Sequence, residues 1–159
     1  MEESISDKST VLLIDDDENI LSSLKRLLRR EPYSIITAGS GEEAIGILNR
    51  SDVDLIVCDY TMPGPTAIET FKLVRKRWPH IVRILMTGHY DTEALVEAVK
   101  NGEAYRFVQK PWNDEELIIT IRQALERAGL KDEVRRLADE VDRCKAQISE
   151  MQKSTSSVR

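Results

Sequence analysis

The sequence predicts an α/β fold: a five-stranded parallel sheet, doubly wound with helices on both faces, and a C-terminal helical coiled-coil extension. Three observations support this prediction. Five short apolar runs, rich in branched residues, alternate with segments in which apolar residues recur at helical spacing. Charged or turn residues bound each run, as is typical of strands. After the fifth helical segment, apolar residues recur at alternating intervals of four and three.

The strands are expected at residues 10–14, 33–38, 53–58, 82–86 and 105–108. Because strand and helix alternate strictly, the strands should run parallel and should be covered on both faces. In such sheets ligands bind beyond the carboxyl ends of the strands. Functional side chains are therefore expected directly after the strands.

The helical segments between the strands carry signals for where they begin. Ser40 and Thr66 each precede a helix and are followed, three positions later, by Glu43 and Glu69, as in a capping box. Asp17 is expected to start the first helix, because an acidic side chain interacts favourably with the positive end of the helix dipole. The apolar positions that define the five helices are Ile20, Leu24, Leu27 and Leu28; Ala44, Ile45 and Leu48; Phe71, Val74 and Trp78; Leu95, Ala98 and Val99; and Leu117, Ile118, Ile121 and Leu125.

Length and composition indicate one domain with an appendage. The chain has 159 residues, of which 41% are apolar, enough for one sizeable core. A formal net charge of −5 argues against sequence-independent nucleic-acid binding by this chain. Two distant cysteines, Cys58 and Cys144, form neither a disulfide framework nor a metal-ligand pattern. No apolar stretch has the length of a membrane span, so we expect a cytoplasmic protein without a membrane segment.

The expected organisation has four parts. Residues 1–9 should be a disordered or extended N-terminus, 10–128 the domain, 129–152 a coiled-coil linker helix and 153–159 a disordered tail. Gly129 is expected to break the helix between the domain and the linker.

The residues after Gly129 form a seam of three heptads. The a positions hold Val134, Val141 and Ile148, and the d positions hold Leu130, Leu137, Cys144 and Met151. Residues branched at Cβ in the a positions, with residues not branched at Cβ in the d positions, favour a parallel two-stranded coiled coil, and hence a homodimer. Glu140 at g and Lys145 at the following e would form a pair between the two chains. The alternative is a single amphipathic helix that folds back onto the domain.

Several polar groups follow the predicted strands. Residues 15–17 after the first strand are all aspartates, and Asp59 follows the third strand. Carboxylates this close repel one another unless a cation neutralises them, and magnesium with oxygen ligands suits such a cluster. Thr87 closes the fourth strand and Lys110 the fifth, adding a hydroxyl donor and a positive charge. Together they predict an acidic metal pocket in which a phosphoryl group can be transferred to an aspartate.

Four segments carry a family resemblance: VLLIDDD at residues 11–17, VCDYTMP at 57–63, LMTG at 85–88 and FVQKP at 107–111. In this order and spacing they resemble the receiver domains of two-component response regulators, including the chemotaxis regulators, over residues 10 to about 128. The resemblance implies the flavodoxin-like receiver fold. The run KPWNDE at residues 110–115 resembles a subgroup of receivers fused to output domains such as transcription activators or cyclic-dinucleotide enzymes.

The resemblance also implies a metal site and a phosphorylation site. Asp59 would accept a phosphoryl group from a sensor histidine kinase or a phosphotransfer protein. Asp16, Asp59 and the backbone carbonyl of Thr61 would hold Mg²⁺, and Asp15 would act mainly through a metal-bound water. The domain would catalyse only its own phosphotransfer and dephosphorylation, and so would be a switch rather than an enzyme acting on other substrates.

The switch residues are implied in the same way. Lys110 would bind a phosphoryl oxygen, Thr87 would move its hydroxyl to the phosphoryl group, and the rotamer of Phe107 would follow Thr87. A cis peptide bond is expected between Lys110 and Pro111.

One segment departs from the family pattern. Where receivers commonly have Met-Asp-Gly, this chain reads Pro65, Thr66 and Ala67, which should alter the loop after the third strand. The alternative classes lack support: an aspartate-nucleophile phosphatase would have a second aspartate at Thr61, and a nucleotide-binding switch would have a glycine-rich loop after the first strand. The remaining alternative is a receiver-like interaction scaffold that is never phosphorylated.

Overall fold

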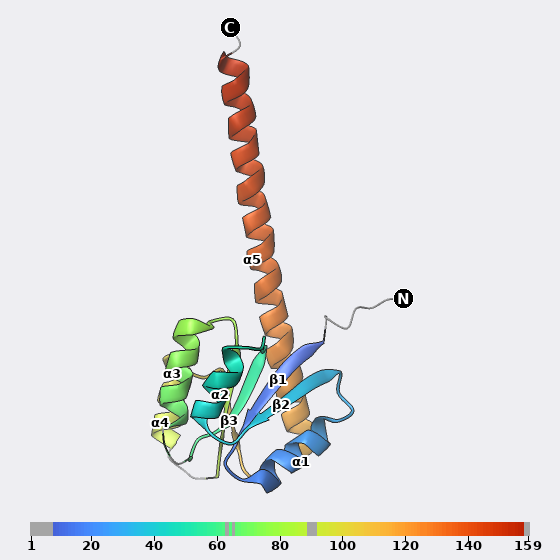
Figure 1. The fold of residues 1–159 in the computed structure, drawn as a ribbon, viewed down its shortest axis with the longest axis vertical. Helices are drawn as coiled ribbons and strands as arrows, with labels where there is room; N and C mark the ends of the chain where they lie inside the picture. The colour runs from blue at the N-terminus through green and yellow to red at the C-terminus, as the bar shows by residue number, and fades with distance from the viewer. Residues whose placement is uncertain (1–7, 63, 65, 89–91, 158–159) are drawn as a thin grey trace.

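The five apolar runs form five parallel strands in a computed structural model that describes residues 8–62, 64, 66–88 and 92–157 (Figure 1). The strands lie in the order β2-β1-β3-β4-β5. Their bounds are β1 Ser9–Ile14, β2 Tyr33–Ala38, β3 Leu55–Asp59, β4 Val82–Thr87 and β5 Arg106–Gln109. The predicted parallel, doubly wound sheet is confirmed.

Five helices alternate with the strands, as the sequence predicted. They are α1 Glu18–Leu28, α2 Gly41–Leu48, α3 Ala67–Arg77, α4 Thr92–Lys100 and α5 Asp114–Ser157. The strand predictions were accurate to within two residues, with one difference that matters for the site. Strand β3 begins at Leu55 and includes Asp59, which we had placed just beyond the strand.

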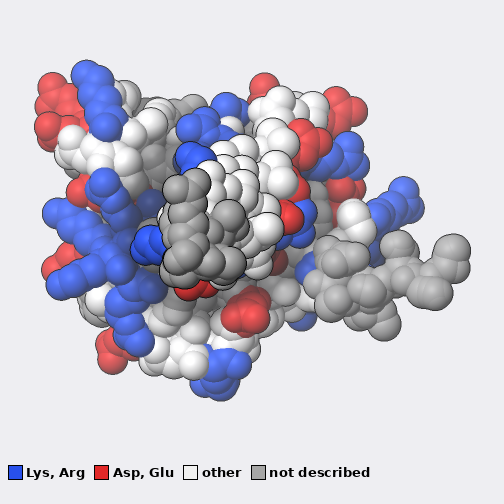
Figure 2. Space-filling model, turned by 90° about the horizontal axis from the view of Figure 1, so that it is seen from above, with Lys and Arg blue, Asp and Glu red and all other residues white. Residues whose placement is uncertain are grey.

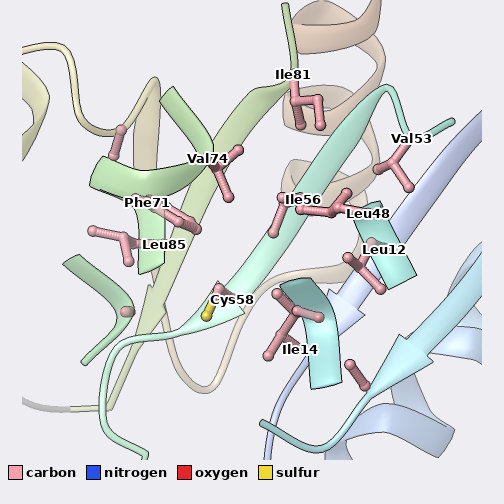
Figure 3. Packing of buried hydrophobic residues seen from close by; sticks show 14 of the residues in the cluster. Leu12, Ile14, Leu48, Val53, Ile56, Cys58, Phe71, Val74, Ile81 and Leu85 are labelled. Atoms are coloured by element: carbon pink, nitrogen blue, oxygen red, sulfur yellow. The ribbon is translucent and has the colours of Figure 1, made fainter. Parts of the chain in front are cut away.

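The core consists of two apolar clusters, one on each face of the sheet, because successive side chains of a strand point to opposite faces. In β1, Leu12 and Ile14 join one cluster, whereas Val11 and Leu13 join the other. The first cluster packs the sheet against α2, α3 and α4, and Phe71 of α3 is fully buried in it (Figure 3). The second cluster packs the sheet against α1 and the first part of α5.

The helix starts follow the predicted capping. The Asp17 side chain accepts a hydrogen bond from the backbone N–H of Asn19. The Ser40 hydroxyl accepts one from the N–H of Glu43, but the Glu43 carboxylate accepts the N–H of Gly39 and not that of Ser40, so the predicted capping box is only half formed at this helix. Thr66 and Glu69 form a complete capping box at the start of α3. Of the departing segment before α3, Pro65 lies outside the described residues, whereas Thr66 and Ala67 begin the helix in the regular way.

Helix α5 is continuous over 44 residues and extends away from the domain (Figure 1). The predicted break at Gly129 was wrong, because the helix passes through this residue without interruption. The helix also includes residues 153–157, which we had expected to be disordered. Along its outer part the apolar seam faces solvent, with exposures of 50% at Leu137 and 67% at Leu130, so this helix does not fold back onto the domain.

A buried arginine stabilises the end of the domain from which α5 leaves. The guanidinium of Arg83 in β4 donates hydrogen bonds to the carbonyls of Ile81 at 2.9 Å, Glu103 at 2.9 Å and Gly102 at 3.1 Å. These bonds hold the turn between α4 and β5, so the charge is buried with its donors satisfied.

The net negative charge of the chain is unevenly distributed. Viewed down α5, Lys and Arg side chains gather on one side of the domain (Figure 2). Three basic residues, Arg75, Lys76 and Arg77, occupy the last turn of α3. Among the described residues, no helix combines the length and apolar character needed to cross a membrane.

Candidate functional site

The predicted site residues meet at the carboxyl edge of the sheet. Strand order reverses between β1 and β3, so Asp15, which follows β1, lies beside Asp59 at the end of β3. Backbone hydrogen bonds hold the neighbouring strand ends in place. Lys110 donates its N–H to the carbonyl of Thr87 at 2.7 Å, and Tyr60 donates to Met86 at 2.7 Å.

Three carboxylates form a cluster at this edge. One oxygen each from Asp15, Asp16 and Asp59 lies within 4.8 Å of the others. Asp15 and Asp59 are buried, with 2% and 8% of their surfaces exposed, whereas Asp16 is exposed. A compact set of carboxylate oxygens fits a hard divalent cation such as Mg²⁺. Thr61 lies two residues beyond Asp59, and its backbone carbonyl as a ligand stays a prediction.

Lys110 lies between the two buried carboxylates. Its Nζ is 2.9 Å from Oδ2 of Asp15 and 3.0 Å from Oδ1 of Asp59. Burial opposes the charged ammonium, but the hydrogen bonds to Asp15 and Asp59 outweigh it, so the pKa of Lys110 is raised. Lys110 therefore carries its positive charge into the site.

The phosphoacceptor candidate has an unusual electrostatic environment. Burial raises the pKa of the Asp59 carboxyl, and although Lys110 opposes this effect, the nearby charges of Asp15 and Asp16 add to it. The ionised form of Asp59 is thus disfavoured relative to a solvated aspartate, and additional positive charge at the site would favour it.

Asp15 and Asp17 have different structural roles although they are close in sequence. The Oδ1 of Asp15 accepts the backbone N–H of Asp17 at 2.9 Å, which orients the Asp15 carboxylate toward the site. Asp17 instead accepts the N–H of Asn19 and starts α1, as predicted. Among the described residues, the carboxylate cluster does not include Asp17.

The predicted switch residues occupy the adjoining strands. Thr87 is the last residue of β4 and is 2% exposed. Phe107 in β5 is half-buried and packs against the cluster shared with α3 and α4. The peptide bond between Lys110 and Pro111 is cis, as the resemblance implied. The functional roles of Thr87 and Phe107 remain predictions.

Sequence reasoning did not find the groove beside Lys110. It lies between α1 and α5, has a volume of about 1010 Å³, and is lined by apolar residues such as Ile20 and Trp112 together with Arg26 and Arg30. The only sequence signal was Trp112, whose indole N–H donates to Asp114 at 3.0 Å. A partner that enters this groove would lie next to the carboxylate cluster.

Comparisons with known proteins agree with this geometry. Residues 11–142 match the response regulator receiver domain family, the phosphoacceptor domains of two-component systems. The chain therefore belongs to this family. Receiver domains of this family use Mg²⁺ at an acidic pocket, and this chain has a cluster of three aspartates at the carboxyl edge of its sheet.

The chain is also similar to curated transcriptional regulators and to a solved receiver domain. The chain is 42% identical over 134 residues to the hydrogenase transcriptional regulatory protein HoxA of Cupriavidus necator, covering 84% of this chain and 28% of that protein. It is 35% identical over 119 residues to the transcriptional regulatory protein GlrR of Escherichia coli K12, covering 75% and 27%. A receiver domain protein of Clostridium thermocellum superposes with a TM-score of 0.72 at 31% identity, covering 77% and 98%. The chain spans less than a third of the length of these two curated relatives.

Proposed function

We propose that this chain is a phosphorylation switch in which Asp59 accepts a phosphoryl group from a sensor histidine kinase or phosphotransfer protein. The observation that carries the proposal is the position of Lys110, whose ammonium contacts both Asp59 and Asp15 inside the carboxylate cluster. A buried carboxylate beside a fixed cation is a nucleophile whose products can be stabilised electrostatically.

The transfer follows from the positions of the side chains. A carboxylate oxygen of Asp59 attacks the phosphorus of phosphohistidine, a P–O bond forms, the P–N bond breaks and the imidazole leaves. Lys110, already 3.0 Å from Oδ1 of Asp59, is close enough to neutralise a phosphoryl oxygen on that carboxylate. Asp16, Asp59 and the backbone carbonyl of Thr61 would hold Mg²⁺, with Asp15 acting mainly through water, and the bound ion would supply positive charge against the remaining negative charge of the site.

The response would pass from the site to the neighbouring strand. The hydroxyl of Thr87 donates a hydrogen bond to the new phosphoryl group, and Phe107 repacks on the adjacent strand β5, which is paired with β4. The result is a population shift between two states of the surface formed by α4, β5 and α5. Because α5 continues from this surface into the seam, the shift can reach a dimer or an output domain.

The seam supports a parallel homodimer. Leu130, Val134, Leu137, Val141, Ile148 and Met151 are each at least half exposed, which is unusual for so many large apolar side chains on one stripe. In a parallel register Glu140 at g faces Lys145 at e of the partner, and Glu126 at g likewise faces Lys131. Both pairs join opposite charges.

The phosphorylation proposal is tested with a small phosphodonor. With Mg²⁺ and labelled acetyl phosphate, the protein should gain one acid-stable, base-labile acyl phosphate, and chelation of the metal should abolish labelling. Asp59→Asn should abolish it as well, whereas Asp52→Asn, a matched change at an exposed position in the turn before β3, should leave it intact. Label retained in Asp59→Asn would exclude Asp59 as the acceptor. No label in the unaltered protein would favour the interaction scaffold.

The dimer proposal is tested by sedimentation of the whole chain. Leu137→Asp should yield a monomer because it introduces a charge at a d position, whereas Ala146→Asp, at an exposed f position, should stay dimeric. A monomer in the unaltered protein would contradict the proposal.

Cys144 reports the direction of the two helices. In the parallel register the two copies meet in one d layer, and a mild thiol oxidant should cross-link them through this exposed cysteine, while Cys58 is buried. In an antiparallel pair, d positions pack against a positions of the partner, so Cys144 would instead face a valine such as Val134. A dimer that does not cross-link would contradict the parallel arrangement.

A further inference from the structure

The seam meets a charged residue where it reaches the domain. Seven residues before Val134, the next a position is occupied by Arg127. In a parallel dimer the two Arg127 side chains would face each other in one layer, and like charges at such a position oppose pairing. The apolar layers therefore begin only at Leu130.

The domain gives Arg127 another partner. Its guanidinium carbon lies 5.4 Å from the centre of the Tyr105 ring, within the range of a cation–π contact. Tyr105 is half-buried directly before β5, and its backbone N–H donates to the carbonyl of Arg83 at 2.7 Å. The ring is thus fixed by the domain and not by the extended part of α5.

The packing of α5 separates the seam from the domain contacts. Leu117, Ile121 and Ala124 are buried against the sheet and occupy b and e positions of the heptad. The a and d positions form a different face, and at 100° per residue the centres of the two faces are roughly 120° apart. A second copy can therefore approach Arg127 without displacing the core contacts of α5.

We infer that Tyr105 holds the charge of Arg127 out of the first a layer, so that the domain sets where the dimer seam begins. This inference rests on the proposed parallel homodimer. The neighbouring charges agree with this inference. In the parallel register Glu126 at g faces Lys131 at the following e position of the second copy, so Glu126 is not available to neutralise Arg127. Arg127 is thus a positioning residue: whether its guanidinium contacts the Tyr105 ring affects the affinity of the dimer.

The test measures the dimer dissociation constant of whole-chain variants by analytical ultracentrifugation. Arg127→Leu should tighten the dimer on the order of tenfold, because it adds an apolar layer in place of two charges. Tyr105→Leu should weaken it by about fivefold, because the charge is released toward the layer. In the Arg127→Leu background, Tyr105→Leu should have no further effect.

Two matched variants serve as controls. Arg135→Leu removes the same charge from the same helix at an exposed b position and should leave the dissociation constant within about twofold. Arg106→Leu removes the other cation near the Tyr105 ring, at 5.3 Å, and should also leave it unchanged, because Arg106 lies outside α5.

The outcomes separate the inference from the dimer proposal. A monomeric unaltered protein would contradict the dimer itself. A dimer whose affinity does not change in Arg127→Leu, or changes equally in Arg135→Leu, would overturn the role of Arg127. A Tyr105→Leu effect of the same size in both backgrounds would show that Tyr105 acts through domain packing and would overturn the contact as the cause. Thermal unfolding followed by circular dichroism identifies any variant whose domain is not folded. If Tyr105→Leu is such a variant, the exposed Arg127→Leu change alone decides whether Arg127 limits the affinity of the dimer.

Discussion

Replacing Asp59 with Asn should make the protein more stable without metal and less responsive to metal. The substitution keeps the shape of the side chain and removes one of three clustered carboxylates. Burial raises the pKa of Asp59, so its ionised form destabilises the folded state relative to the unfolded chain. With a chelator at neutral pH, Asp59→Asn should therefore unfold at a higher temperature than the unaltered protein.

The pH dependence has a defined sign. Because the pKa of Asp59 is raised in the folded state, its contribution to stability is fully present below its ordinary value of about 4 and is lost as pH rises through the folded value. The advantage of Asp59→Asn should consequently be large at neutral pH and disappear as pH falls below about 4.

Magnesium should reverse the order of the two melting temperatures, so that the unaltered protein unfolds at a higher temperature than Asp59→Asn. Three carboxylates against the single ammonium of Lys110 leave two uncompensated negative charges in the cluster, and Asp59→Asn leaves one. A ligand that binds only the folded state at one hundred times its Kd adds about 2.7 kcal/mol of stability. For a domain of this size that gain raises the melting temperature by roughly 5–10 °C. The Asp59→Asn variant should gain a small fraction of this.

Calorimetry with and without Mg²⁺ checks both parts, with Asp52→Asn as the control that should behave like the unaltered protein. An equal Mg²⁺ shift in Asp59→Asn would refute the carboxylate cluster as the metal site. A lower melting temperature of Asp59→Asn in chelator would show that the contact with Lys110 outweighs burial and charge repulsion.

Three further predictions concern stability and are checked by denaturant unfolding followed by circular dichroism. Phe71→Ala should lower the free energy of unfolding by about 3–5 kcal/mol, because the ring is fully buried. Leu73→Ala on the same helix should lower it by less than about 1 kcal/mol, because Leu73 is 39% exposed. Similar losses in the two variants would contradict the assigned packing. Arg83→Leu should cost about 3 kcal/mol, because three carbonyls lose a charged donor; a cost below about 1 kcal/mol would mean that water replaces those bonds. Thr66→Ala should cost about 1 kcal/mol through loss of the capping box, and an unchanged midpoint would mean that the cap contributes nothing.

Local signals were enough to locate most elements of this fold. The alternation of strands and helices depends on periodicities of about two and 3.6 residues, which are visible in the sequence without any partner. Caps at Ser40 and Thr66 depend on residues three positions apart. The same reasoning erred at Gly129, because a glycine in an exposed helix costs only about 1 kcal/mol and the helix former residues on both sides offset it.

The site was only partly visible from sequence. The topology of a parallel sheet brings the strand ends together, so the candidates Asp15, Asp59, Thr87 and Lys110 could be named as one group. The hydrogen bonds among these side chains could not be predicted. Whether Lys110 bonds to one carboxylate or to both depends on how β5 sits relative to β1 and β3, and these strands are far apart in the chain. The groove at Trp112 was missed because its lining residues come from segments far apart in the chain, and no local sequence pattern indicates that they lie together.

The sequence by itself determined the order of the elements, the apolar stripe of α5 and the residue types at the strand ends, because each depends on neighbours within a few positions. Only the tertiary structure decided which buried charges are paired, as at Arg83 and Lys110, and which apolar side chains stay exposed on the seam. Burial and pairing depend on residues brought together by the whole fold. The same physical reason explains why the contact between Tyr105, just before β5, and Arg127 in α5 could be found only in three dimensions.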